Sequence, residues 1–168
     1  MAHGLSKTKL LACLQCRKRL WLELHRPELA EPGAAAIGFR HGHGVGEAAR
    51  SLHPGGILVE TDDLAQALAE TRRLMVEHPA KPLFEAAFEY DGVLIRPDLL
   101  VPDRIGHRMV EVKASTQIKD YHYNDCAVQA WVCRKAGLPL GRVELAHVDT
   151  GFVYPGGGDY RGLLKGNT

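Results

Sequence analysis

The sequence predicts a mixed α/β (α+β) fold, in which a mixed sheet is flanked by helices and preceded by an N-terminal helix. Three observations predict this class. Apolar residues recur at helical spacing in residues 6–25, and a second helix is expected over residues 120–136, closed by Gly137. Short runs of strand-forming residues lie between these helices and include the hairpin signal Asp91-Gly92. A further such run, 142–148, follows the second helix, and 168 residues suffice for one domain with its own core.

The N-terminal helix is expected over residues 6–25. Ser6 is a suitable N-cap, because its hydroxyl can accept hydrogen bonds from the amides of the first turn. A linker rich in proline and acidic residues, 27–33, then separates this helix from the next one. The apolar residues at helical spacing are Leu10, Leu14, Leu20 and Leu24.

Two further helices are expected before the strands. Residues 38–52 form the first of them in spite of several glycines, and the run His53-Pro54-Gly55-Gly56 ends it. Thr61 caps the other, which extends to about residue 77. The run His78-Pro79 stops this helix, because the residue before a proline avoids helical geometry.

The sheet is expected to begin with a hairpin, formed by residues 83–90 and by a strand that starts at Val93. A turn at residues 105–107 leads to a third strand over residues 108–114.

The C-terminal part has one helix and one strand in the prediction. Gly137 closes the helix 120–136, and the last strand is 142–148. Residues 1–154 are expected to form one domain. The tail 155–168 has no strong pattern, and we expect it to be the start of a further segment.

Asp98, Glu111 and Lys113 are the most informative residues of the chain. Glu111 and Lys113 are two positions apart in a predicted strand, so both point to one side while Val112 turns to the core. Asp98 falls near the end of the preceding hairpin strand, which brings all three together. Two carboxylates offer the oxygen ligands that Mg²⁺ or Mn²⁺ prefers, and an ammonium beside them orients a water or offsets charge on a phosphate. A metal-dependent nuclease needs this constellation, whereas Glu-x-Lys alone is more often an exposed surface pair.

With these residues the chain resembles the PD-(D/E)XK nuclease superfamily, and within it the RecB-like branch. Leu-Ser-Lys at 5–7 and Cys-Arg-Lys-Arg-Leu-Trp-Leu at 16–22 are similar to the opening helix of CRISPR-associated RecB-like exonucleases. Glu-Val-Lys-Ala-Ser-Thr at 111–116 is similar to the strand of an uncharacterised bacterial RecB-like family, whose members continue well beyond this length. The resemblance covers residues 1–154 and implies a restriction-endonuclease-like αβββαβ core.

The resemblance implies roles for the motif residues. Asp98 and Glu111 match the carboxylates that hold one Mg²⁺ or Mn²⁺ in the family, and the carbonyl of Val112 is expected to help. Lys113 is expected to position the attacking water and aid its activation.

A further metal ligand is expected on the helix 38–52. Glu47 matches an acidic residue that commonly completes the metal or water shell in the superfamily. Gly46 stands where many RecB-like enzymes have a metal-binding histidine. The nearest substitute is His43, which shares a helix face with Glu47 because the two are four residues apart. We favour Glu47 as the ligand, and a partly exposed helix histidine is the alternative for His43.

Gln129, on the helix 120–136, matches a glutamine that RecB-like nucleases place near the scissile phosphate or the displaced strand, and we expect it to be catalytic. The family has a tyrosine four residues later, but this chain has Cys133 there, which removes the role of the tyrosine. A buried amide bonded to the backbone is the alternative for Gln129.

Positive charge is concentrated near the N-terminus, although the net charge of the chain is only +1. Residues 1–27 have six Lys or Arg and one acidic residue, so this stretch suits phosphate contacts. A solvated helix face is the alternative. The residues expected to bind nucleic acid are Lys7, Arg17, Lys18, Arg19 and, by stacking on bases, Tyr121.

The four cysteines are compatible with two interpretations. Cys13, Cys16, Cys126 and Cys133 could form an iron–sulfur or zinc site, but their spacings on helices suit buried core thiols equally well. We assign no iron–sulfur ligand, and the lack of a signal peptide predicts a reducing compartment without disulfides.

Composition excludes a membrane-spanning protein, because no apolar run approaches about 20 residues. A cytoplasmic location is expected.

The predicted function is a metal-dependent deoxyribonuclease that hydrolyses phosphodiester bonds in single-stranded or free-ended DNA, in repair, recombination or defence. One alternative is a nucleic-acid-binding module on the nuclease fold, inactive without further C-terminal parts. Another is an unrelated enzyme or metal-binding regulatory domain in which the motif is fortuitous.

Overall fold

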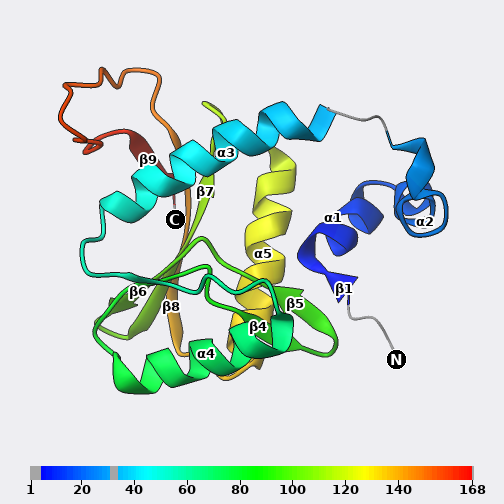
Figure 1. Ribbon diagram of the computed structural model, residues 1–168, viewed down its shortest axis with the longest axis horizontal. Helices are drawn as coiled ribbons and strands as arrows, with labels where there is room; N and C mark the ends of the chain where they lie inside the picture. Colours follow the sequence, from blue (N-terminus) through cyan, green and yellow to red (C-terminus); the bar gives the residue numbers. More distant parts are fainter. Residues whose placement is uncertain (1–4, 31–33, 168) are drawn as a thin grey trace.

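The computed structural model describes residues 5–30 and 34–167, with side chains described for residues 6–30 and 43–167. The fold has the predicted mixed α/β class, with a sheet flanked by helices and with an N-terminal helical segment (Figure 1). None of the described helices is long and apolar enough to span a membrane.

The larger sheet has six strands in the order β2-β3-β6-β7-β8-β9. Parallel strands β7 and β8 are connected by helix α5 (Asp120–Lys135), whereas β6 and β7 are antiparallel neighbours. The strands are β2 (Ile57–Leu58), β3 (Leu83–Phe84), β6 (Leu99–Asp103), β7 (Gly106–Lys113), β8 (Leu140–Val148) and β9 (Leu164–Asn167).

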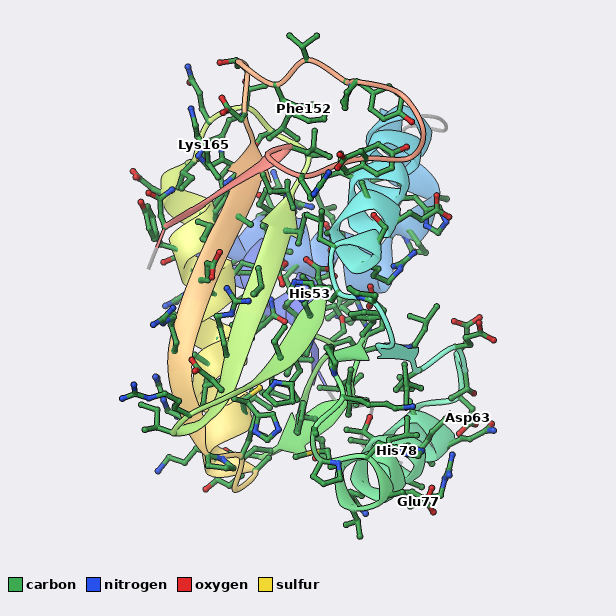
Figure 2. All side chains as sticks on the ribbon, turned by 90° about the vertical axis from the view of Figure 1, so that its left-hand side faces the viewer. His53, Asp63, Glu77, His78, Phe152 and Lys165 are labelled. Atoms are coloured by element: carbon green, nitrogen blue, oxygen red, sulfur yellow. The ribbon has the colours of Figure 1, made fainter. Side chains whose placement is uncertain are left out.

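The two faces of β7 pack against different helices. Met109 belongs to a core cluster with Val132 of α5, while Val110 belongs to a second cluster with Ala49 of α3 (Ala34–Ser51). α5 and α3 accordingly lie on opposite faces of the sheet (Figure 2). Since side chains alternate along a strand, the odd-numbered residues of β7 face α5.

The segment predicted as one N-terminal helix consists of two. α1 (Lys7–Gln15) and α2 (Arg17–His25) are separated by Cys16, whose backbone is extended at φ −164° and ψ 116°. α2 buries none of its side chains, so tertiary packing does not hold it in line with α1. The predicted linker contains a short 3-10 helix, Pro27–Leu29.

Two other helix boundaries differ from the prediction. α3 starts at Ala34 and not at residue 38. α4 (Leu64–Glu77) is capped by Asp63 and not by Thr61: the Asp63 carboxylate accepts a hydrogen bond from the Gln66 N–H at 2.8 Å. The Thr61 hydroxyl instead accepts from the Asp63 N–H at 3.2 Å, so it stabilises the turn before the helix.

The strand predicted over residues 83–90 is broken. Glu85 has a φ of 54°, which ends β3, and the chain then enters a second sheet at β4 (Phe88–Tyr90). The predicted hairpin is confirmed, because β4 pairs antiparallel with β5 (Val93–Ile95). Alternating strand propensity could not show the break, since it depends on which sheet each half joins.

The tail predicted to lack a pattern contains a strand. β9 pairs antiparallel with β8, with Val148 opposite Leu164, and Leu164 packs against the core cluster of Val110. The run 142–148 is therefore not the last strand. A pairing partner that lies elsewhere in the sequence, and not the composition of the tail itself, makes this segment a strand.

Candidate active site

β7 brings Glu111 and Lys113 together on the face that packs against α5. Glu111 is buried, with 2% of its surface exposed. Lys113 Nζ lies 2.7 Å from Glu111 Oε1. The predicted placement of these two side chains on one side of the strand is confirmed.

Asp98 comes from the neighbouring strand. It directly precedes β6, and its Oδ2 accepts a hydrogen bond from the Val112 N–H at 2.6 Å. The predicted position of Asp98 near the end of the hairpin strand is wrong, because β5 ends at Ile95 and Asp98 leads into a new strand. The predicted convergence with Glu111 on antiparallel strands is confirmed, because β6 and β7 are antiparallel and Leu99, next to Asp98, pairs with Val110, next to Glu111.

Arg96 fixes the backbone that leads to Asp98. Its guanidinium donates hydrogen bonds to three main-chain carbonyls, those of Glu85 at 3.1 Å, Thr61 at 3.0 Å and Val59 at 2.5 Å. These carbonyls belong to segments far apart in the sequence. Arg96 therefore joins the loop before α4 to the break between β3 and β4, a role that no sequence pattern indicated.

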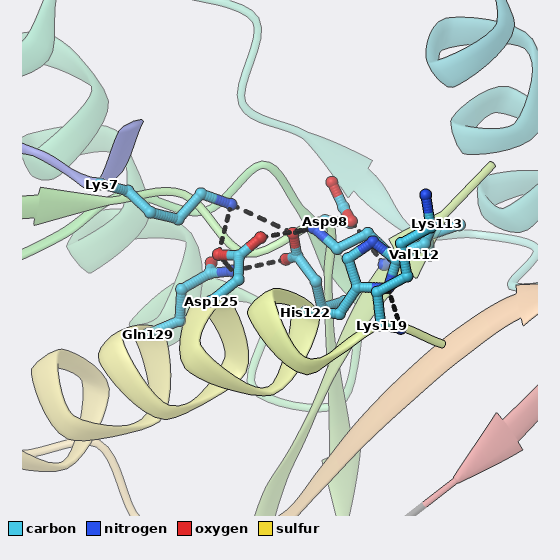
Figure 3. Close-up of polar contacts among 9 residues, drawn as sticks. Lys7, Asp98, Val112, Lys113, Lys119, His122, Asp125 and Gln129 are labelled. Carbon is cyan, nitrogen blue, oxygen red and sulfur yellow. Dashed lines mark hydrogen bonds and ion pairs between the residues drawn. The ribbon is translucent and has the colours of Figure 1, made fainter. Parts of the chain in front are cut away.

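α5 contributes Asp125 and Gln129, which share one face of the helix because they are four residues apart. Gln129 is fully buried, and its Nε2 donates to Glu111 Oε2 at 2.6 Å and to Asp125 Oδ1 at 3.0 Å. Lys113 Nζ also donates to Asp125 Oδ2. Gln129 is therefore bonded to carboxylates and not to the backbone (Figure 3). Sequence reasoning missed Asp125, although its position one turn before Gln129 was a usable signal.

Lys7 lies inside this network, although it was predicted to contact DNA. Its Nζ is 3.1 Å from Glu111 Oε1 and 3.1 Å from Asp125 Oδ1 (Figure 3). Ser6 caps α1 as predicted, because its hydroxyl accepts from the Lys9 N–H at 3.4 Å. The first residue of α1, Lys7, therefore places its side chain in the site.

The charges in the network stabilise one another. Burial by itself would lower the pKa of Lys113, but Glu111 and Asp125 outweigh it and raise this pKa above its usual value. The pKa of Lys7 is raised in the same way, against the effect of burial. Burial would raise the pKa of Asp125, but Lys7 and Lys113 lower it. Lys113 is therefore suited to act as a fixed cation and not as a proton acceptor.

Asp98 and Glu111 suit a divalent cation by the chemistry of their oxygen donors. Burial and the neighbouring charge of Glu111 raise the pKa of Asp98 well above its usual value. A bound cation would relieve the repulsion between the two carboxylates. Among residues 6–30 and 43–167, no group of three or more His, Cys, Asp or Glu side chains is placed to hold a metal ion. The fit is therefore that of a carboxylate pair, which leaves other coordination positions to main-chain oxygen, water or substrate.

A cavity of about 790 Å³ opens beside the carboxylate pair. Glu85 is on its wall, and burial raises the pKa of Glu85. The cavity has room for more than one small group. Its polar and charged lining comes from His43, Arg50, Glu60, Asp62, Glu85, Arg96, Asp98, Glu111 and Lys113.

The helix α3 presents His43 and not Glu47 to this cavity. His43 and Gly46 line it, whereas Glu47 is turned by about 100° from Gly46 and is not part of the lining. Glu47 Oε1 lies 3.3 Å from His43 Nε2, and its side chain is 63% exposed. The structure therefore does not bring Glu47 into the network of Glu111 and Lys113.

The other residues predicted to bind nucleic acid lie outside the network. Arg17, Lys18 and Arg19 are exposed on α2, and Arg19 Nε donates to Glu23 at 2.7 Å. Tyr121 is 57% exposed at the start of α5. Because more than half of its surface is exposed, Tyr121 is not buried against the edge of the sheet.

The cysteines have different environments. Cys126 and Cys133 are buried on α5, and burial raises the pKa of each thiol to about 12. The interpretation as core thiols is confirmed for these two. It is wrong for Cys16, which is exposed at the break between α1 and α2, and Cys13 is half-buried.

Comparison of the chain with protein-family models and with curated proteins found no match.

Proposed function

We propose that this protein is a metal-dependent deoxyribonuclease of the RecB-like branch of the PD-(D/E)XK superfamily. The observation that carries the proposal is the network of Asp98, Glu111, Lys113 and Gln129 beside the cavity. Lys113 and Gln129 both donate hydrogen bonds to Glu111, and the Val112 N–H joins Asp98 to the same strand. Asp98, Glu111 and Lys113 line the cavity. Residue types chosen from sequence patterns alone would not be expected to converge unless the patterns reflected one site.

The arrangement of the elements supports the proposed nuclease core. A helix, α3, precedes the strands, β6 and β7 are antiparallel, and α5 then crosses over to β8, which is parallel to β7. This is the order that an αβββαβ core requires. Asp98 directly precedes β6, and the Glu-x-Lys pair lies on β7.

Asp98 and Glu111 would hold the cation, with the Val112 carbonyl as a further donor. A bound Mg²⁺ or Mn²⁺ supplies Lewis-acid polarisation of a phosphoryl oxygen. The chain's own contribution is to keep these carboxylates in place. The Val112 N–H holds Asp98, and the Gln129 amide holds Glu111.

Lys113 supplies positive charge where charge develops on the phosphate and orients the attacking water. Because its pKa is raised, Lys113 keeps its proton at neutral pH. Asp125 accepts one of its hydrogen bonds and so fixes the ammonium. In this proposal Asp125 and Gln129 are positioning residues.

Binding of DNA without cleavage is a second candidate function, favoured by the exposed basic residues of α2. Arg17 and Lys18 are exposed and suit contacts with backbone phosphates, and Tyr121 is 57% exposed and suits stacking on a base. Binding through such contacts weakens steeply with salt.

Cleavage of end-labelled single- and double-stranded DNA, in Mn²⁺, in Mg²⁺ or in EDTA, tests the proposal. Glu111→Gln removes a proposed ligand. Glu144→Gln is the matched control, since Glu144 lies on the adjacent strand and pairs with Arg108 away from the site. We expect metal-dependent products from the unchanged chain and from Glu144→Gln, and none from Glu111→Gln. Salt-sensitive DNA binding without products in any metal would favour the second candidate.

A further inference from the structure

Lys7 has an unusual place for a lysine near the start of a chain. Its ammonium bridges Glu111 Oε1 and Asp125 Oδ1, at 3.1 Å from each. The side chains of Glu111 and Asp125 are only 3% and 6% exposed, and that of Lys7 is 23% exposed. Removal of one partner from a buried ion pair of this kind is destabilising, because it leaves the charge of the other partner uncompensated.

The N-terminal segment fixes Lys7 at this point. β1 (Leu5–Ser6) pairs parallel with β5, with Leu5 opposite Val93, and Ser6 then caps α1. Lys7 is the first residue of α1, so its side chain leaves the helix next to the point where the segment pairs with β5 of the smaller sheet. Docking of the N-terminal segment and occupancy of the acidic site are thereby connected through one side chain.

Glu111 has no free carboxylate oxygen in this arrangement. Oε1 accepts from Lys7 and Lys113, and Oε2 accepts from Gln129. A divalent cation that binds Glu111 must share an oxygen with one of these donors. Sharing with an ammonium brings like charges together, and such repulsion is strong where water is largely excluded.

We propose that Lys7 is a built-in competitor of the divalent cation: docking of the N-terminal segment through Lys7 and binding of the cation at Glu111 oppose each other. This inference rests on the proposed function, because it needs a cation at Glu111. Since coupling between two binding events is reciprocal, the cation weakens docking of the segment as much as docking weakens the cation.

The first test measures Mn²⁺ binding by calorimetry, without DNA, on the whole chain. Lys7→Met removes the charge but keeps the length of the side chain, and Lys7→Arg keeps the charge. Lys9→Met is the matched control, because Lys9 lies on the same helix and makes no ion pair with another described residue. Glu111→Gln identifies binding at the site.

We expect Lys7→Met to bind Mn²⁺ at least about tenfold more tightly than the unchanged chain, since each factor of ten needs only about 1.4 kcal/mol. Lys7→Arg and Lys9→Met should match the unchanged chain. Equal or weaker binding by a folded Lys7→Met variant overturns the inference and leaves the proposed function intact. Absence of any Mn²⁺ binding that Glu111→Gln removes overturns both.

The second test uses the unchanged chain, so it decides the matter even if Lys7→Met does not fold. Amide hydrogen exchange of residues 5–9 is compared with and without Mg²⁺. We expect faster exchange in Mg²⁺, because the cation weakens the anchor at Lys7, and no such change in Glu111→Gln. Slower or unchanged exchange of this segment in saturating Mg²⁺ would contradict the proposed competition.

Discussion

At the scale of single residues, Asp125 connects the other polar groups of the site. It accepts from Gln129 and is paired with both Lys7 and Lys113. It touches neither Asp98 nor the cavity wall among the described contacts. Its expected effect on chemistry is therefore indirect, through the position of the Lys113 ammonium.

Asp125→Asn should separate this positioning role from DNA binding. The amide keeps the shape but removes the charge that holds Lys113, so we expect the single-turnover cleavage rate to fall about 10- to 100-fold, equivalent to about 1.4–2.7 kcal/mol. DNA affinity should change little, since the exposed residues of α2 are untouched. Single-turnover kinetics and a binding titration at fixed salt measure the two effects.

Asp120→Asn is the control for this change, because Asp120 is exposed in the first turn of the same helix. It should cleave at the rate of the unchanged chain. A full cleavage rate in Asp125→Asn would show that Lys113 does not need this partner.

At the scale of elements, the entry to β7 depends on one glycine. Gly106 has a φ of 121°, and a Cβ there would lie 2.1 Å from the Pro139 carbonyl oxygen. That carbonyl accepts from the His107 N–H at 2.8 Å, which joins the start of β7 to the start of β8. A side chain at Gly106 would therefore disturb the pairing that places Glu111 beside α5.

Gly106→Ala should lower the free energy of unfolding by about 1–3 kcal/mol, through the close contact and the strained backbone. Gly44→Ala is the control, because a Cβ at Gly44 meets no atom within 4 Å. On a helix this change should leave the free energy of unfolding unchanged or raise it by up to about 1 kcal/mol. Urea denaturation measures both, and equal stability of the two variants would contradict the contact at Pro139.

At the scale of the whole molecule, buried titratable groups make stability depend on pH in opposite directions. Burial lowers the pKa of His107, so its contribution to stability is present above the ordinary histidine pKa of about 6.5 and is lost as the pH falls. Burial and Glu111 raise the pKa of Asp98, so its contribution is lost as the pH rises. The total slope mixes both effects.

Comparison with His107→Gln isolates the histidine. We expect the free energy of unfolding of the unchanged chain to fall more than that of His107→Gln between about pH 7.5 and pH 5.5, because only the unchanged chain takes up a proton at this position on unfolding. Urea denaturation at the two pH values measures the difference. Parallel losses in the two proteins would contradict a depressed pKa for His107.

Much of the site was predictable because strand geometry is local. The two-residue period of a strand put Glu111 and Lys113 on one side, and the Asp91-Gly92 turn marked the hairpin before Asp98. Gln129 was predicted from the family resemblance, and no local period indicated that it meets Glu111 of β7. The strand and turn predictions need only the few residues around them, so the amino-acid sequence by itself determined the motif and the class of fold.

Only the tertiary structure decided how distant segments meet. Lys7 reads as one of several basic residues near the N-terminus, and its place between Glu111 and Asp125 follows from the pairing of β1 with β5. Glu47 has the expected residue type, but the packing of α3 turns His43 and Gly46 to the cavity instead. The strand β9 likewise depends on its pairing with β8. The physical reason is that ion pairs, helix orientation and strand partners are set by side chains far away in the sequence. Local periodicity contains no information about those distant side chains.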